Sequence, residues 1–449
     1  MTALAWRSLR HRPRAGIATF LAVLLGTLLI GSFATLAESA AGAPAPDDGT
    51  LVILGAVVGG WGAAIVLFSV ASTVGITTTQ RAEEIGLLRT IGATPRQARR
   101  LIAREAAAIS FAGAGLGAVG AAIAGRLLFD LVRGGGLVSG RTEYGGGPVS
   151  VAGAALLVLV VSAIAAAIAA RRATRGPAGV LARDSAAERG RMRWWRIAIA
   201  LLLIGYGLAM AVVTVTVTAH DDDPYAAMST SGSSSILVGL GLAVLAPVLL
   251  RWGAGPVRLL AGTSATAHLA AYNTARRSHL LGGVLAPVVV LTAAAVGTLM
   301  LVDIDRRTLP DGTADSDTIT LLNNVVVGMI SLFAAIMVVN AFVAMLAHRH
   351  DELRRLRLLG ATPRQVRSSV AAEAAVVAAV GVATGAVAAL TTVVPFAVAR
   401  DEGVVPDGGL WLAPVVAAAV AVLTVGAARG AVRSAVRDAA GRPATASAR

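Results

Sequence analysis

The stretch QRAEEIGLLRTIGATPRQ (80–97) recurs in altered form as HRHDELRRLRLLGATPRQ (348–365), and these two copies decide the fold. Both copies contain the hexapeptide GATPRQ, and they start 268 positions apart, at residues 80 and 348. Glycine takes the left-handed conformation at the end of a helix without steric cost. We therefore expect one helix to end at Gly92 and another at Gly360.

The residues after each glycine predict the start of a second helix. In the first copy Thr94 is the expected N-cap, and Pro95 stands at the first helical position, where its missing N–H costs nothing. Gln97 then completes a capping box. The equivalents in the second copy are Thr362, Pro363 and Gln365. Each copy is thus predicted to be a helix, a tight turn and a second helix. Long apolar segments on both sides would hold this elbow at a membrane surface.

The composition is that of a membrane protein. Of the 449 residues, 56% are hydrophobic and 14% are charged, whereas ordinary soluble proteins carry about 25% charged residues. Apolar runs of about 18 residues or more recur along the chain, which is the signal of transmembrane helices. Cysteine is absent. Disulfides, thiolate metal sites and cysteine nucleophiles are therefore excluded.

The net charge of +14 is explained by membrane topology. Ten spans with both chain ends in the cytoplasm place most arginines on the inner side and most acidic residues on the outer side. That partition is the positive-inside rule. Because no basic patch is left over, no nucleic-acid partner is expected.

The predicted fold is an all-α polytopic membrane protein with ten transmembrane helices. The predicted spans are 15–37, 51–78, 103–125, 148–170, 197–219, 235–250, 280–302, 321–347, 371–396 and 410–428. The alternative interpretation of the first apolar run is a cleaved signal peptide. The run exceeds the roughly 7–15 residues of such a signal, which favours an uncleaved anchor.

The repeat extends beyond the two elbows and predicts the domain organisation. Glu105 aligns with Glu373, and the GxxxG spacing of span three recurs in span nine, where small residues let helices approach closely. These helix-packing glycines are Gly113, Gly117, Gly381 and Gly385. The chain divides into a first four-span unit (1–175), a linker with spans five and six (176–265), and a second four-span unit (266–449). An even number of spans separates equivalent positions, so the units are parallel repeats and both elbows face the cytoplasm.

The sequence contains no catalytic constellation. It has no lysine and therefore no Walker-type phosphate loop, so the chain cannot hydrolyse ATP by that route. Two candidate metal clusters have ordinary explanations. Residues 220–223 (HDDD) belong to a solvated acidic loop, and His348 with His350 flanks the end of a span, with no further ligands at suitable spacing. We expect neither a metal nor a cofactor to be bound by this chain.

Two alternative functions make different demands on the same residues. An ion-coupled carrier needs ionisable groups near the bilayer midplane, and the predicted span centres are almost free of them. The elbow helices could instead lie on anionic lipid. Anchoring alone does not require matched turns, so two copies with the same turn chemistry favour a protein partner.

Residues 81–106 (RAEEIGLLRTIGATPRQARRLIAREA) and 349–374 (RHDELRRLRLLGATPRQVRSSVAAEA) resemble the FtsX-like permease family. Members of this family are membrane subunits of mechanotransmitting, MacB-type ABC transporters. The second copy departs from the first, because Arg354 and Arg355 stand where the first has Gly-Leu. The resemblance covers two FtsX-like units in one chain.

The resemblance implies that each elbow is a coupling helix seated in a cytoplasmic ABC ATPase, with two ATPase copies per chain. ATP and Mg²⁺ would be used by that ATPase. The implied coupling residues are Glu84, Leu88, Arg89, Gly92, Thr94, Pro95 and Gln97, and, in the second copy, Glu352, Leu356, Arg357, Gly360, Thr362, Pro363 and Gln365.

The resemblance further implies a permease of the bacterial plasma membrane with both termini in the cytoplasm. The outer loops 38–50 and 303–320 are short, so a large extracytoplasmic partner is not expected. A lipid, a hydrophobic small molecule or a peptide is the expected substrate. A non-transporting regulator of cell-envelope enzymes, driven by the same ATPase, is the first alternative. An ion-coupled carrier is the second.

Overall fold

The computed structural model describes residues 13–79, 89–90, 92–174, 192, 194–221, 226–260, 265–308, 328, 336–339, 341–342, 345 and 358–440. Within these ranges the chain is mostly α-helical and contains no β-strand. The all-α prediction is therefore confirmed for the described part of the chain.

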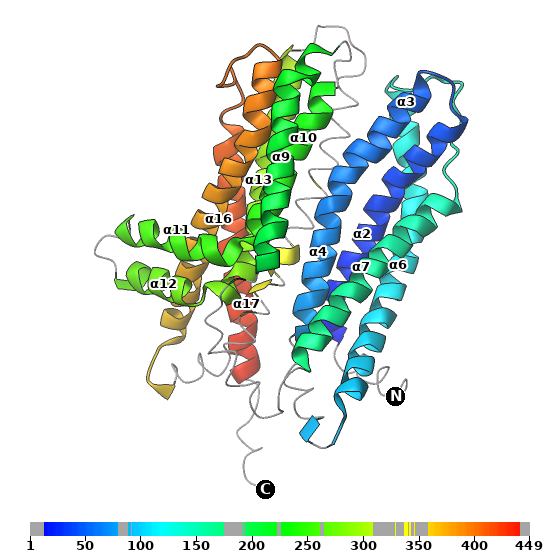
Figure 1. The fold of residues 1–449 in the computed structure, drawn as a ribbon. Coiled ribbons are helices and arrows are strands. Elements are labelled where there is room, and N and C mark those ends of the chain that lie inside the picture. The colour runs from blue at the N-terminus through cyan, green and yellow to red at the C-terminus, as the bar shows by residue number, and fades with distance from the viewer. Residues whose placement is uncertain are drawn as a thin grey trace.

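The helices form two bundles that stand side by side (Figure 1). The first bundle contains α2 (Pro13–Ser39), α3 (Asp47–Val52), α4 (Gly59–Thr79), α6 (Pro95–Gly134) and α7 (Pro148–Ala173). The second contains α9 (Trp194–Thr216), α10 (Ala226–Val244), α13 (Ser278–Thr308), α16 (Pro363–Ala399) and α17 (Leu412–Ala440). Two shorter helices, α11 (Ala246–Leu260) and α12 (Ala265–Arg276), lie across the second bundle (Figure 1).

Eight of the described helices are long and apolar enough to cross a membrane. Two predicted spans are not among them. The span at 51–78 is helical, but one turn of π-helix (Ile53–Val58) connects α3 to α4. Most of the span at 321–347 lies outside the described residues. The protein is a multi-pass membrane protein, and the count of ten spans stays a prediction.

Three predicted boundaries are wrong. The loop expected at 220–235 is largely helical, because α10 begins at Ala226. Span six was expected at 235–250, but α10 ends at Val244 and α11 follows in a different direction (Figure 1). The outer loop expected from residue 303 begins later, since α13 continues to Thr308.

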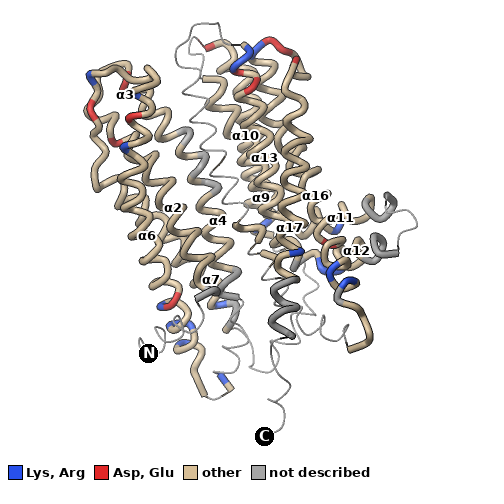
Figure 2. Tube along the Cα trace, turned by 180° about the vertical axis from the view of Figure 1, so that it is seen from behind, with Lys and Arg blue, Asp and Glu red and all other residues tan. Residues whose placement is uncertain are grey.

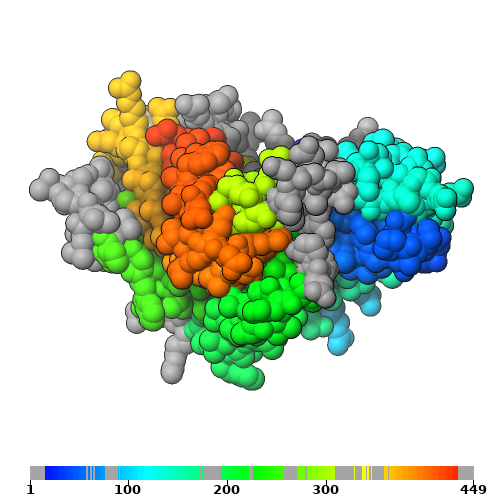
Figure 3. All heavy atoms as spheres, turned by 90° about the horizontal axis from the view of Figure 1, so that it is seen from above, coloured from blue at the N-terminus to red at the C-terminus, as the bar shows by residue number. Residues whose placement is uncertain are grey.

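The two bundles share part of their hydrophobic core. One cluster of buried side chains in the first bundle, centred on Phe33 and Phe129, also includes Ile236 and Leu240 of α10 and Val290 of α13. A second cluster surrounds α13 and holds the second bundle together. The helices α10 and α13 therefore connect the bundles. Viewed along the helices in Figure 3, the described atoms of the two bundles lie next to each other.

Candidate functional site

Both predicted turns have the backbone conformation that requires glycine. The φ angle is +103° at Gly92 and +97° at Gly360, a region that costs other L-residues about 1–2 kcal/mol. A Cβ atom at either position would meet nothing within 4 Å. Glycine is needed here for its backbone angle and not for lack of space.

The capping boxes are present in both copies with nearly the same geometry. The N–H of Gln97 donates to Oγ1 of Thr94 at 3.3 Å, and the N–H of Thr94 donates to Oε1 of Gln97 at 2.9 Å. The equivalent distances at Thr362 and Gln365 are 3.3 and 2.8 Å. Two of the amide groups at each helix start are thereby satisfied. Each turn is locally rigid.

The two turns lie at the same end of the molecule. The helices α6 and α16 begin directly after them, and both begin at the lower end in Figure 1. We call this the elbow end. Helix α2 also begins there and α17 also ends there (Figure 1). The opposite end carries a concentration of acidic residues and some arginines (Figure 2).

The residues around the turns are exposed. Thr94, Gln97, Thr362 and Gln365 are all exposed, as are Arg96 and Arg364 beside the prolines. Just before the second turn, Leu358 and Leu359 are 79% and 84% exposed. Two adjacent leucines open to solvent at a polar end of the molecule form an apolar patch.

Of the four charged residues predicted to contact an ATPase, Arg89 is the one that the structure describes. Its guanidinium lies 3.5 Å from the carbonyl oxygen of Thr174, at the end of α7. Arg99, which the sequence reasoning missed, donates to Oγ1 of the same threonine at 2.6 Å. The first turn is therefore attached to α7 from both sides. Five further predicted coupling residues lie outside the described part of the chain: Glu84, Leu88, Glu352, Leu356 and Arg357.

Beyond each turn, a carboxylate is buried at the equivalent position of α6 and α16. Glu105 is 4% exposed and Glu373 is 0% exposed. The two residues are the pair that the sequence repeat aligns. The structure adds that both carboxylates are buried within the protein.

The four predicted packing glycines stand where two helices are in close contact. A Cβ at Gly117 would lie 2.4 Å from the carbonyl oxygen of Leu24 in α2, and one at Gly113 would lie 2.9 Å from that of Phe20. A Cβ at Gly385 would lie 2.8 Å from the carbonyl oxygen of Val289 in α13. The remaining glycine, Gly381, packs on Val288 of α13. The pair α6–α2 thus resembles the pair α16–α13.

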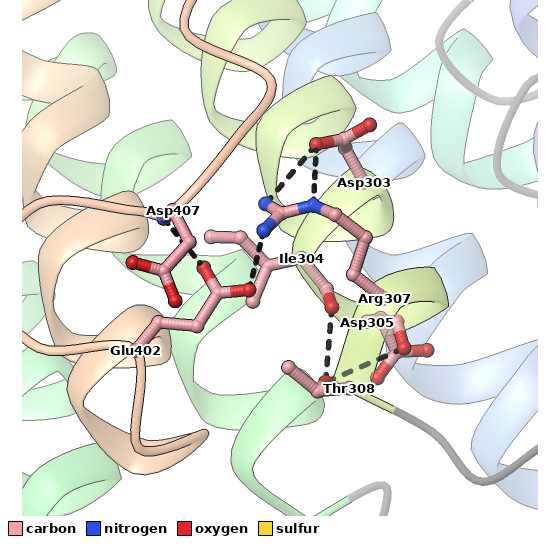
Figure 4. A network of polar contacts seen from close by, with 7 residues as sticks. All are labelled: Asp303, Ile304, Asp305, Arg307, Thr308, Glu402 and Asp407. Carbon is pink, nitrogen blue, oxygen red and sulfur yellow. Dashed lines mark hydrogen bonds and ion pairs between the residues drawn. The ribbon is translucent and has the colours of Figure 1, made fainter.

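The far end of the second bundle contains an ion-pair network that the sequence reasoning missed (Figure 4). Arg307 pairs with Asp303 at 3.1 Å and with Glu402 at 2.5 Å. Glu402 also accepts the N–H of Asp407 at 3.2 Å. Beside this network, Asp305 pairs with Arg400 at 2.6 Å, with both side chains largely buried. The network attaches the loop after α16, orange in Figure 3, to the end of α13.

The far end of the first bundle uses carboxylates to hold backbone amides. Glu38 accepts from the N–H groups of Gly147 and Ser150 at the start of α7. Asp47 accepts from the N–H and hydroxyl of Ser139 and from the hydroxyl of Thr142. These hydrogen bonds, first from Ser139 and then from Thr142, lower the pKa of Asp47.

Among the described residues, no group of three or more His, Asp or Glu side chains could hold a metal ion. His220 and Asp221 belong to the described residues. Asp222, Asp223, His348 and His350 lie outside them.

The eight membrane-length helices and the paired, capped turns at one end define a multi-pass helical membrane protein with two equivalent halves. The family model described as FtsX-like permease C-terminal matches residues 56–178 and 324–435. Together these segments make up slightly more than half of the chain, and each contains one turn. The chain belongs to the FtsX-like permease family. No curated protein matches the chain.

Proposed function

We propose that this chain is the permease subunit of an ABC transporter and that a separate cytoplasmic ATPase docks on its two turns. The observation that carries the proposal is the pair of turns itself. Both have the same left-handed glycine and the same capping box, and both lie at the elbow end. Family membership supports the proposal, since FtsX-like permeases generally work with a cytoplasmic ATPase. Two equivalent turns match a pair of ATPase subunits, so two copies would bind per chain.

The helices that follow the turns would transmit the motion of the ATPase. Helix α6 has 40 residues and α16 has 37, which corresponds to about 60 and 55 Å at 1.5 Å per residue. Each helix therefore runs from its turn to the opposite end of the molecule. A turn that moves with an ATPase subunit would carry the whole helix with it. Export or release of a lipid, a hydrophobic small molecule or a peptide would follow.

Topology can be tested directly because the chain contains no cysteine. Single-cysteine variants Arg96→Cys and Arg364→Cys place a thiol at an exposed position beside each turn, and Val404→Cys places one at the opposite end. A membrane-impermeant maleimide applied to intact bacterial cells should label only position 404. Labelling at 96 or at 364 under these conditions would place a turn outside the cytoplasm and refute the proposal.

Docking is tested by purifying the chain together with an ABC ATPase encoded beside it. Changing both exposed leucines (Leu358→Asp, Leu359→Asp) should reduce the bound ATPase from two copies to one, because both lie at the second turn, and Glu84→Gln with Glu352→Gln tests the predicted charged contacts of both turns. The matched control is Leu410→Asp, which alters an exposed leucine at the opposite end and should leave the complex intact. A full complement of ATPase on both turn variants would contradict docking at the turns.

The same docking would serve a regulator of an enzyme outside the membrane. Transport by the complex, reconstituted in proteoliposomes with ATP, distinguishes the two. An ion-coupled carrier would purify without an ATPase and would work without ATP.

A further inference from the structure

Helix α11 (Ala246–Leu260) has an orientation that the transmembrane helices do not share. It leaves the end of α10 and runs across the second bundle, with α12 beside it (Figure 1). In the same view α11 lies at the level of the lower end of α9, whereas α6 and α17 continue further down (Figure 1).

That level corresponds to the edge of the hydrocarbon core. Helix α9 has 23 residues, or about 34 Å, which is close to the roughly 30 Å thickness of the core. It begins with Trp194 and Trp195, both exposed, and tryptophan is enriched at membrane interfaces. The start of α9 therefore marks the interface at the elbow end, and α11 lies at this depth.

One face of α11 is buried in the protein. Ala246, Leu250 and Ala254, spaced four residues apart, are fully or almost fully buried. Between them Gly253 is so close to α16 that a Cβ would lie 2.8 Å from a methyl group of Val380. The buried face thus fixes α11 against the helix that carries the second turn.

The other face is exposed and has the residues of an interfacial helix. Trp252 is 77% exposed, and Arg251, Gly255 and Pro256 are exposed beside it. Residues 246–277 contain four arginines and no acidic residue. Arginines appear on both α11 and α12 in Figure 2. A positive helix with an exposed tryptophan, lying at the edge of the core, matches a surface of anionic headgroups.

We propose that α11 lies in the headgroup region of the leaflet at the elbow end and binds anionic phospholipid through Arg251, with Trp252 at the boundary of the acyl chains. Through Gly253 and Val380 it holds α16 at a fixed height in the membrane. This proposal does not require an ATPase, so it stands or falls independently of the proposed function.

The depth of α11 can be measured with spin labels on single-cysteine variants of the full chain. Gly255→Cys labels the exposed face of α11, where a Cβ meets nothing within 4 Å. Tyr206→Cys, exposed in the middle of α9, is the control for the hydrocarbon core, and Arg96→Cys is the control for water. The chain is placed in nanodiscs of phosphatidylcholine and phosphatidylglycerol at a ratio of about 3:1, a content of anionic lipid sufficient to attract arginines. Power saturation then compares access of oxygen and of a water-soluble nickel chelate.

The label at 255 should give a value between the two controls. A value equal to that at 96 would place α11 in water, and a value equal to that at 206 would place it in the core. Either result would overturn the proposal.

Lipid selectivity is tested by native mass spectrometry of the detergent-purified chain titrated with phosphatidylglycerol. Arg251→Gln should weaken binding roughly five-fold, as expected for one arginine at a lipid surface. Arg141→Gln, an exposed arginine at the opposite end, is the matched control and should leave the titration unchanged. Equal binding by the Arg251 variant and the wild type would overturn the assignment of Arg251.

Discussion

Replacing Gly117 by alanine should force two helices of the first bundle apart. The new Cβ would lie 2.4 Å from the carbonyl oxygen of Leu24 and 2.9 Å from Cβ of Thr27, whereas ordinary contacts begin at 3.4 Å. The nearest atom belongs to the backbone of α2 and cannot rotate away as a side chain would. Helices α2 and α6 must therefore separate by about 1 Å at this point, which forfeits a quarter to a half of each local dispersion contact.

The expected loss of stability is about 1–3 kcal/mol, the usual effect of overpacking a well-packed interior. A matched control lies two residues away in the same helix. Gly115→Ala adds the same methyl group where no atom lies within 4 Å. It should be neutral or slightly stabilising, because alanine favours a helix by about 1 kcal/mol over glycine.

The free energy of unfolding can be measured by titrating the purified chain with sodium dodecyl sulfate in mixed micelles and following tryptophan fluorescence. Gly117→Ala should unfold at a clearly lower detergent fraction than Gly115→Ala. If the two variants unfold together, the close approach of α6 and α2 at Gly117 is not a constraint on stability.

Three further predictions concern the capping box, the buried ion pair and a carboxylate at the far end. Thr94→Ala should destabilise the first turn of α6 by about 1 kcal/mol. The backbone amides of that turn should then exchange hydrogen roughly five-fold faster. Unchanged exchange would contradict the role of this cap. Asp305→Asn removes the carboxylate that pairs with buried Arg400 at 2.6 Å and should lower the free energy of unfolding by roughly 3 kcal/mol. Adding Arg400→Gln to this variant should cause a smaller further loss, because the partner charge is already gone. If the losses of the two single variants simply add, the two side chains are not coupled. Because the pKa of Asp47 is lowered, its contribution to stability is present above the ordinary value of about 3.9 and is lost as the pH falls through the lowered value. Stability measured between about pH 5 and 2 should therefore fall less steeply in Asp47→Asn, and identical profiles would contradict this.

The turns could be predicted from the sequence because their chemistry is local. The glycine at 92 and the Thr-Pro-x-Gln pattern that follows specify a backbone angle and a capping box within six residues. Positions 360–365 repeat that pattern. No distant contact is needed to set the geometry, and the structure has it in both copies. An even number of predicted spans separates the two turns, which predicts that both lie at the same end of the molecule.

The helix boundaries near the middle of the chain could not be predicted, because they depend on distant partners. The serines of STSGSSS (229–235) are typical of a loop, yet Ser231 donates to the carbonyl oxygen of Thr392 at 2.8 Å and accepts from its hydroxyl at 2.6 Å. Thr392 is 161 positions away from Ser231 in the sequence. These hydrogen bonds satisfy polar groups of Ser231, so the serine-rich segment can form a buried helix although its composition is typical of a loop.

The end of α13 was missed for a related reason. Acidic residues at 303 and 305 indicate a solvated loop when they are considered alone. In the fold Asp303 pairs with Arg307 one turn along, and Asp305 pairs with Arg400, 95 positions away. Both charges are neutralised within the protein, so the helix can continue to Thr308.

Unequal stiffness of the two long helices has a mechanical consequence. A straight rod of about 60 Å that pivots by roughly 5° at its centre displaces its two tips by about 2.6 Å in opposite directions. Helix α6 has no interior proline and can act as such a lever along its full length, whereas α16 contains Pro395 close to its far tip. Proline removes one backbone hydrogen bond and permits a bend there. An equal push on both levers would thus reach the far side undiminished through α6, whereas α16 can bend at residue 395 while its tip stays with the end of α13, to which Arg400 is paired through Asp305.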